Sequence, residues 1–142
     1  MSGENSRFVV DASVGIKLFV NEQDSQKALD LFARLTEDPP AELFVPDLFF
    51  IECANILLKY SRRFGRSLRH SQADLDDLGA LALKSVSTSD LMKESLTFAS
   101  KTNLTAYDAC YAVLARQLNI PLVTADEPMA KSVKWAILLG DL

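Results

Sequence analysis

The sequence is poor in the residues that usually form a transition-metal or redox site. Among its 142 residues it has one histidine, His70, and two cysteines, Cys53 and Cys110. The two cysteines show neither zinc-finger spacing nor a Cys-x-x-Cys motif. Both lie in apolar helical segments, so we expect buried free thiols of the kind found in reducing compartments. These features argue against a zinc site and against a disulfide-stabilised fold.

The sequence also lacks a hydrophobic run long enough to cross a bilayer. The apolar stretch at residues 8–20 is interrupted by Asp11 and Lys17, which is unlike a secretory signal. Repeats, low-complexity segments and linker-like stretches are missing as well. We therefore expect a cytoplasmic protein with no membrane partner. Residues 1–142 are expected to form a single domain, because this length suits one hydrophobic core.

A surplus of basic residues is missing too. The chain has 15 lysines and arginines against 19 aspartates and glutamates, a formal net charge of −4, and its pI is about 4.9. This balance argues against a protein that coats nucleic acid non-specifically, because such binding depends on net positive charge. A local basic surface is compatible with it.

The segments that are present alternate between short β-type runs and longer helical patterns. Strands are predicted at residues 7–10, 43–45, 84–87, 120–124 and 135–139. Helices are predicted between them at residues 11–19, 25–35, 47–64, 71–82, 89–101, 105–119 and 126–133. This alternation is typical of the α/β class, with a parallel sheet covered by helices on both faces.

Several helix starts are marked by residues that cap helices. Thr105 is a good N-cap and has an acid three residues later, as in a capping box. Asp47 is placed to cap the helix that follows Pro46. Ser71 is predicted to open another helix, with Asp74 at capping-box spacing. The helix after Thr105 is apolar nearly all round, so we expect most of its surface to be buried.

Three acids fall at the same edge of this expected sheet. Asp11 ends the first strand, and Asp126 follows the strand at residues 120–124. Asp108 lies in the first turn of the helix that leads into that strand. Ligands of open parallel sheets bind beyond the carboxyl ends of the strands, which is where these acids meet. The alternative is that each acid only caps its helix and complements the helix dipole, and for Asp108 alone this is the favoured interpretation.

A fourth acid, Glu52, interrupts the very apolar stretch at residues 48–54. A buried, unpaired glutamate is costly, so Glu52 needs either a cation or a partner such as an arginine. One shared site explains four such acids more simply than four separate roles. Crowded carboxylates stay ionised only around a positive charge. Oxygen ligands without a cysteine or histidine cluster indicate Mg²⁺ or Mn²⁺, which can activate water and stabilise the leaving oxygen of a phosphodiester.

Basic residues follow Glu52 along the same predicted helix face. They are Lys59, Arg62, Arg63 and Arg66. A metal site beside such a basic stripe suits a nucleic-acid backbone, so we expect these side chains to bind RNA. The alternative is a solvated helix end whose cations complement the dipole.

Four segments, in this order, resemble the PIN-domain nucleases, and within them the VapC-type toxins of bacterial toxin–antitoxin pairs. They are residues 8–13, 51–57, 104–109 and 122–126. Each segment alone is weakly specific, but four of them in this order at this length are specific. The resemblance covers nearly the whole chain.

The resemblance implies a three-layer α/β/α sandwich with a mainly parallel central sheet. It also implies a metal-dependent endoribonuclease that uses Mg²⁺ or Mn²⁺, frequent homodimers, and inhibition by a small antitoxin whose tail occupies the active-site groove. Which RNA is cut does not follow from the sequence.

The family's four acids correspond to the acids already singled out here. Asp11 and Asp108 would be the main metal ligands, and Asp126 would bind directly or through water. Glu52 would bind a metal or orient the attacking water. Ser13 and Thr124 match hydroxyl positions that support the site in many members.

Some family members carry a further acid shortly after the position of Asp126, and here Glu127 is adjacent to it. Other classes fit less well. A haloacid-dehalogenase-type phosphatase needs a second aspartate where Ser13 stands, and a response regulator needs an acidic pair that is missing near Val10. A catalytically weak PIN-like module that only binds RNA or protein is the main alternative. Such modules usually lose some of the acids, whereas this chain keeps all four.

Overall fold

The computed structural model describes residues 6–142, so the first five residues of the expected domain lie outside the described part. Five strands form one parallel sheet in the order β3-β2-β1-β4-β5. The strands are β1 (Arg7–Val10), β2 (Glu42–Pro46), β3 (Lys84–Val86), β4 (Leu122–Thr124) and β5 (Ala136–Leu138). All five predicted strands are confirmed. The fourth is shorter than expected because the Ile120 amide bonds to the Ala115 carbonyl, at the end of the preceding helix, and not to the sheet.

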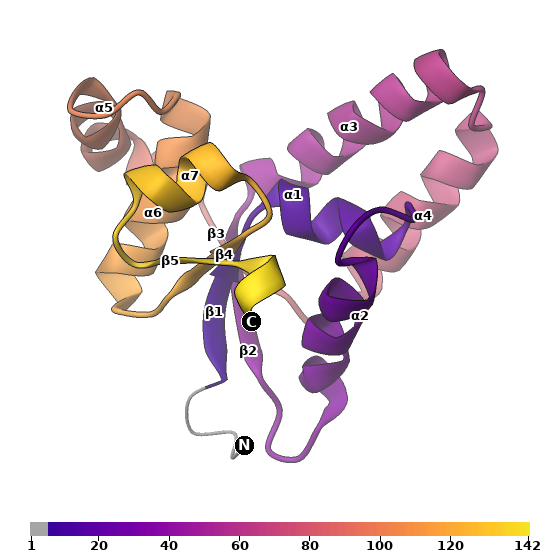
Figure 1. The fold of residues 1–142 in the computed structure, drawn as a ribbon, viewed down its shortest axis with the longest axis horizontal. Coiled ribbons are helices and arrows are strands. Elements are labelled where there is room, and N and C mark those ends of the chain that lie inside the picture. Colours follow the sequence, from indigo (N-terminus) through magenta and orange to yellow (C-terminus); the bar gives the residue numbers. More distant parts are fainter. Residues whose placement is uncertain (1–5) are drawn as a thin grey trace.

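Helices cover both faces of this sheet, as the alternating pattern predicted (Figure 1). Those between β1 and β3 lie on one side, and those that follow β3 lie on the other. The first group contains α1 (Ala12–Gly15), α2 (Ser25–Ala33), α3 (Leu48–Phe64) and α4 (Leu68–Ala80). The second group contains α5 (Met92–Ser100), α6 (Ala106–Leu118) and α7 (Glu127–Ser132). Short 3₁₀ turns extend several of these elements, among them η2 (Ile16–Leu18) and η4 (Thr88–Leu91).

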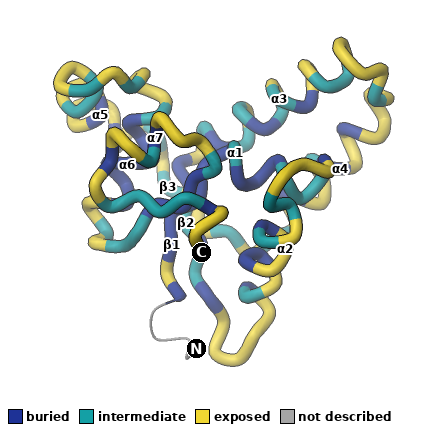
Figure 2. The backbone as a smooth tube through the Cα atoms, in the orientation of Figure 1, coloured by how far each residue is buried: buried dark blue, intermediate teal, exposed yellow. Residues whose placement is uncertain are grey.

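The core runs through the central strands and α6 (Figure 2). Phe8, Val9 and Val10 of β1 are all buried, because a central parallel strand is covered on both faces. Every residue of α6 from Ala109 to Ala115 is buried as well, which confirms that most of this helix surface is internal. Cys53 and Cys110 are buried free thiols, as predicted.

The strand order places a topological switch point between β1 and β4. From β1 the chain moves outward to β2 and β3, and it then returns on the other side of β1 to form β4. The connections that leave β1 and β4 therefore diverge to opposite faces, and a crevice opens at their carboxyl ends. Asp11 follows β1 directly, and Asp126 stands two residues after β4.

The structure corrects two of the predicted helix caps, those of α4 and α3. Ser67, not Ser71, caps α4 by accepting the His70 amide at 3.1 Å, so α4 begins at Leu68 and Ser71 is buried inside it. The reason is the turn at Gly65, whose φ of +70° suits glycine and lets the next helix start almost at once.

Asp47 stands at the N-cap position of α3 but makes no capping bond. Its carboxylate accepts the Thr88 amide at 2.9 Å and the Thr88 hydroxyl at 2.5 Å, which fastens the start of α3 to η4. The Thr105 cap of α6 is confirmed, since its hydroxyl accepts the Asp108 amide at 3.1 Å. None of the described helices is both long and apolar enough to span a bilayer.

Candidate active site

A pocket of about 520 Å³ lies at the carboxyl end of the sheet, beside the switch point. All four predicted acids line it: Asp11, Glu52, Asp108 and Asp126. They arrive from the end of β1, the middle of α3, the first turn of α6 and the turn after β4. The structure thus brings together four carboxylates that are far apart in the sequence.

Asp11 is buried and its carboxylate is held from three directions. Oδ1 accepts the Ser13 hydroxyl at 2.5 Å and the Val14 amide at 3.3 Å, and Oδ2 accepts the Thr124 hydroxyl at 2.5 Å. The contact with Val14 is the N-cap bond of α1. Asp11 is therefore both the cap of α1 and a member of the acid pocket, so the two roles considered from sequence are combined in one residue.

The hydroxyls of Ser13 and Thr124 connect Asp11 to the turn after β4. The Ser13 hydroxyl also accepts the Ala125 amide at 2.9 Å, and the Thr124 hydroxyl accepts the Asp126 amide at 3.1 Å. Each hydroxyl thus donates to the Asp11 carboxylate and accepts from the backbone that carries Asp126. This arrangement fixes the position of one acid relative to the other.

Burial raises the pKa of Asp11 to about 6, although the hydrogen bonds from Ser13, Thr124 and Val14 lower it. The charge of Asp108 raises it further. The low-dielectric surroundings disfavour the ionised form more than the three donors stabilise it. A bound cation is the natural counterweight to this penalty.

Glu52 is half-buried and is bound by a tyrosine, not by the arginine that the sequence left open as its partner. The Tyr111 hydroxyl donates to Oε1 of Glu52 at 2.5 Å. Burial raises the pKa of Glu52, the Tyr111 hydrogen bond lowers it, and the charge of Asp108 raises it. Burial also raises the pKa of Tyr111, so this phenol stays a donor at neutral pH. Tyr111 was not among the site residues predicted from the sequence. Tyr111 stands three residues after Asp108 on α6, and this spacing, which places both side chains on one helix face, could have indicated that Tyr111 lies at the acid pocket.

The charge of Asp126 acts on Asp108 across the pocket. Burial is the larger cause of the raised pKa of Asp108, and the charge of Asp126 is the next. Asp126 itself is exposed at the N-cap of α7. The acids therefore form one electrostatically coupled group.

This donor set fits a hydrated, hard divalent cation. Among residues 6–142, no three Asp, Glu, His or Cys side chains lie close enough together to enclose a metal ion by themselves. Mg²⁺ keeps several waters and is commonly bound through only one or two carboxylates, so a pocket of spaced carboxylates with room for water suits it. Zinc prefers a closed tetrahedral set of nitrogen and sulfur ligands, which this pocket does not offer.

The predicted basic stripe is only partly at the pocket. Lys59 lines the pocket. Arg62 and Arg63 lie further along α3 with exposed side chains, outside the pocket lining. Arg66 lies beyond the end of α3 and forms an ion pair with the buried Asp74. The prediction that Arg66 continues the basic face of this helix is therefore wrong. Glu127 lines a different pocket, beside β5, together with Lys131 and Asp141.

Three polar residues of the pocket region were missed from sequence. Lys17 and Glu22 line the pocket, and Tyr60 binds Glu22 from α3. Lys17 lies in η2, a 3₁₀ turn inside the predicted helix 11–19, so the α-helical period does not give its direction, and Glu22 lies in the irregular segment between η2 and α2.

The fold and this pocket define an α/β protein with a carboxylate site at the switch point of a parallel sheet. Residues 8–133 match the family model described as PIN domain. The chain is 34% identical to Ribonuclease VapC3 of Pyrobaculum aerophilum over 129 residues, which cover 88% of this chain and 93% of that relative. The protein belongs to the PIN-domain family.

Solved structures agree with this assignment. A crystal structure of PAE2754 from Pyrobaculum aerophilum superimposes with a TM-score of 0.67 at 27% identity, covering 94% of this chain and 91% of the other. A toxin–antitoxin complex from Klebsiella pneumoniae contains a chain with a TM-score of 0.65 at 15% identity, covering 94% of this chain and 98% of that one. At that identity the second likeness shows the fold alone.

Proposed function

We propose that this PIN-domain protein is a metal-dependent endoribonuclease of the VapC type that hydrolyses RNA phosphodiester bonds with Mg²⁺ or Mn²⁺. The observation that carries the proposal is the convergence of Asp11, Glu52, Asp108 and Asp126 on one pocket at the switch point. The 34% identity to a protein named as a ribonuclease, over most of both chains, supports it.

In this proposal three acids would hold the metal and the fourth would bind a metal or orient the water. Asp11 and Asp108 would be the main metal ligands, and Asp126 would bind directly or through water. When bound, the metal supplies Lewis-acid stabilisation of the leaving oxygen and a more acidic water. Tyr111 keeps Oε1 of Glu52 occupied and its carboxylate oriented, which leaves Oε2 to bind a metal or to accept a hydrogen bond from the attacking water.

Ser13 and Thr124 are positioning residues in this mechanism. Both donate to Asp11 and accept from the backbone next to Asp126, so they keep the spacing of two carboxylates fixed. A preorganised ligand set of this kind does not have to rearrange when a cation binds. Lys59 lies on the α3 side of the same pocket and is placed to contact an RNA phosphate.

The proposal extends to partners. The 34% identity to a protein named Ribonuclease VapC3, together with the VapC-like segments, supports a role as the toxin of a VapBC-type pair. A small antitoxin would then inhibit the protein by placing its tail in the acid pocket. We also propose a single domain, a homodimer and a cytoplasmic location, in line with the family resemblance.

A cleavage assay with a matched pair of variants tests the enzymatic proposal. Asp108→Asn should reduce RNA cleavage by about 100-fold or more, the scale on which a group that acts in the transition state contributes. Asp77→Asn, an exposed position on α4, makes the same chemical change and should leave cleavage at the wild-type level. Mn²⁺ should raise the Tm of the wild type and of Asp77→Asn, because it binds the folded state preferentially. A wild type that neither cleaves RNA nor responds to Mn²⁺ is instead a PIN-like binding module.

A further inference from the structure

Lys17 is a cation inside the acid pocket that the four-carboxylate mechanism does not use. It lies in η2, just after the α1 turn that Asp11 caps. Its side chain is only 11% exposed, and it lines the same pocket as the acids. The Nζ atom donates to Oε1 of Glu22 at 3.2 Å. A lysine this covered is normally held for a reason, because its ammonium is costly to remove from water.

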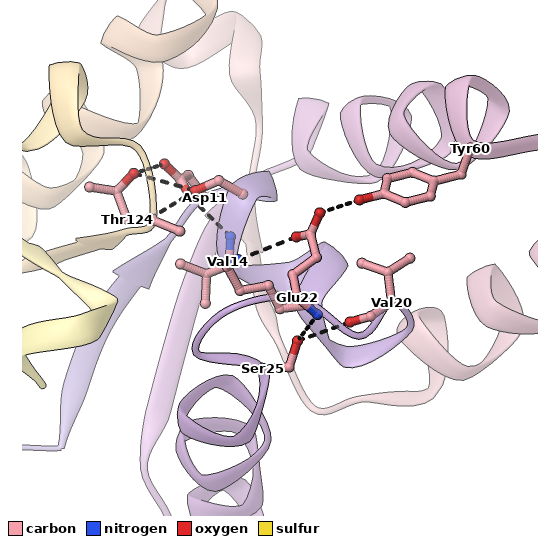
Figure 3. A network of polar contacts seen from close by, with 10 residues as sticks. Asp11, Val14, Val20, Glu22, Ser25, Tyr60 and Thr124 are labelled. Atoms are coloured by element: carbon pink, nitrogen blue, oxygen red, sulfur yellow. Dashed lines mark hydrogen bonds and ion pairs between the residues drawn. The ribbon is translucent and has the colours of Figure 1, made fainter. Parts of the chain in front are cut away.

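Glu22 is itself fixed from two sides. The Tyr60 hydroxyl, from α3, donates to Oε2 of Glu22, and Figure 3 shows the two side chains meeting between α3 and the segment that precedes α2. Bonding to Glu22 raises the pKa of Tyr60 to about 12, so the phenol remains a donor at neutral pH. The Glu22 amide donates to the Ser25 hydroxyl at 2.9 Å, and that hydroxyl donates to the Val20 carbonyl at 2.9 Å. The carboxylate that receives Lys17 is therefore anchored to two elements.

Among residues 6–142, Glu22 is the hydrogen-bond partner of the Lys17 ammonium, so further donors of this group remain for a ligand at the pocket. An ammonium group has three N–H donors, and the contact with Glu22 takes one of them. The pocket lining contains five carboxylates and two lysines, Lys17 and Lys59. The carboxylates of the pocket repel an anionic phosphate, so a phosphate can bind there only next to a cation. Each of the two lysines should therefore have a large effect on the affinity of the pocket for RNA.

This inference rests on the proposed ribonuclease function. We propose that Lys17 binds a phosphate group of the RNA backbone at the pocket, and that Glu22 and Tyr60 act as positioning residues that hold its ammonium there. Lys17 comes from η2 and Lys59 from α3, so the two lysines reach the pocket from different elements. The RNA backbone then passes between two cations beside the carboxylates.

The competing explanation is that Lys17 and Glu22 form an ion pair that only stabilises the fold. Glu22→Gln separates the two ideas because they predict opposite signs. If Glu22 is merely one more negative charge in the pocket, its neutralisation should strengthen RNA binding. If Glu22 positions Lys17, the same change should weaken RNA binding several-fold although the pocket has become less negative.

The first measurement is the affinity of a single-stranded RNA as a function of salt, in the Asp108→Asn background, which prevents cleavage. Lys17→Gln should weaken binding and reduce the slope of log K against log [salt] by about 0.7, the value for one phosphate contact to a single strand. Lys93→Gln is the matched control, because Lys93 is exposed on α5 away from the pocket and the charge change is the same. Lys17→Arg should retain most of the affinity and the full slope.

The second measurement is steady-state cleavage with otherwise wild-type protein. Lys17→Gln and Tyr60→Phe should raise KM for RNA several-fold, while the Mn²⁺-induced rise in Tm stays equal to that of the wild type. Tyr60→Phe changes no charge, so it tests positioning alone. Unchanged KM and salt slope in Lys17→Gln, or tighter RNA binding in Glu22→Gln, would overturn the inference. Those results would leave the proposed function standing as long as the wild type still cleaves RNA, whereas a wild type without cleavage refutes the function itself.

Discussion

Asp11 is the residue that shows most clearly how the acid pocket lowers the stability of the metal-free fold. It is buried at the end of the central strand, and its pKa of about 6 lies well above the ordinary value of 3.8. An ionised Asp11 therefore destabilises the metal-free fold at neutral pH. The difference corresponds to about 3 kcal/mol when the carboxyl is fully ionised in both states. In the proposed function a bound cation would offset this cost, because it would stabilise the ionised carboxylate.

The direction of the pH dependence follows from the sign of this shift. Between pH 4 and pH 6 the unfolded chain loses the Asp11 proton before the folded chain does. The stability that this group contributes is present below pH 4 and is lost as the pH rises through about 6. In EDTA, the wild type should lose about 1.5 kcal/mol more of its free energy of unfolding between pH 5 and pH 8 than Asp11→Asn loses. Urea unfolding at the two pH values measures this.

The same experiment shows whether Asp11 is a structural partner. Glu52 and Asp108 also have raised pKa values and are present in both proteins, so the difference reports Asp11 together with its interaction with Asp108. We expect Asp11→Asn to be at least as stable as the wild type at pH 8 without metal. A variant that melts well below the wild type there would mean that the ionised carboxylate stabilises the fold.

The four acids could be predicted from sequence because each interrupts or ends an apolar segment, and such positions are conspicuous. Their contacts could not. The Tyr111 bond to Glu52 and the Lys17–Glu22–Tyr60 network join segments that lie far apart in the chain. No local period predicts that two such segments meet. The acids that line the pocket could thus be predicted from the sequence, whereas the presence of Lys17 beside the predicted Lys59 could not.

At the scale of elements, the hairpin of α3 and α4 is the feature that sequence predicted least well. The two helices project together from the rest of the molecule (Figure 1). The predicted basic stripe of this helix extends through Gly65 to Arg66. In the structure α3 ends at Phe64 and the chain reverses its direction. Arg66 instead binds Asp74, and both side chains are largely buried, at 15% and 9% exposure. The ion pair holds the turn between the two helices.

Removing Arg66 should be costly because the buried Asp74 carboxylate loses its arginine partner and keeps only the longer contact, 3.9 Å, with Nε2 of His70 among the described residues. Arg66→Met should lower the free energy of unfolding by about 3 kcal/mol. Arg69→Met, at an exposed position on α4, the helix that carries Asp74, is the control and should change stability little. The double variant Arg66→Met/Asp74→Leu should recover much of the loss. Chemical denaturation of the four proteins measures these differences, and equal stability of Arg66→Met and Arg69→Met would show that the ion pair contributes nothing.

The outer part of α3 carries Arg62 and Arg63, which the structure leaves exposed and beyond the pocket. If both arginines contact phosphates of the RNA outside the pocket, neutralising both should weaken RNA binding for all substrates alike. The salt slope should then fall by up to about 1.4, the value for two contacts to a single strand. Filter binding in the Asp108→Asn background measures this. The alternative is that the arginines only interact with the dipole at the C-terminal end of α3. In that case the salt slope of RNA binding stays unchanged and only the free energy of unfolding changes.

At the scale of the whole molecule, the sequence predicted the class of fold but not the order of the strands. Alternating strands and helices require a parallel sheet, and hydrophobic periods located each strand. The position of β1 between β2 and β4 depends on which face each connection crosses, and the composition of a connection carries no such information. The resemblance to the PIN-domain nucleases implied three layers and a mainly parallel sheet, and the strand order itself comes from the structure.

The two thiols offer a probe of the whole fold. Cys53 on α3 and Cys110 on α6 are 0% and 1% exposed, on helices from opposite faces of the sheet. Burial, followed by the charges of Glu52 and Asp11, raises the pKa of Cys53 to about 12. Neither thiol should react with a labelling reagent in the native protein, and both should react together once the fold opens. Rapid native labelling of either one would contradict its burial.

The order in which the acids occur along the chain has a consequence for synthesis. A ribosome adds Asp126 to the chain long after Asp11, yet the two acids follow neighbouring strands and are joined through Thr124. Until residues 122–126 have emerged, β1 has no partner on that side and the pocket has no closing wall. A chain that has not yet reached these residues therefore cannot bring all four acids into one pocket. If the four acids act together as proposed, a growing chain should begin to cleave RNA only after the turn that follows β4 has been made and folded.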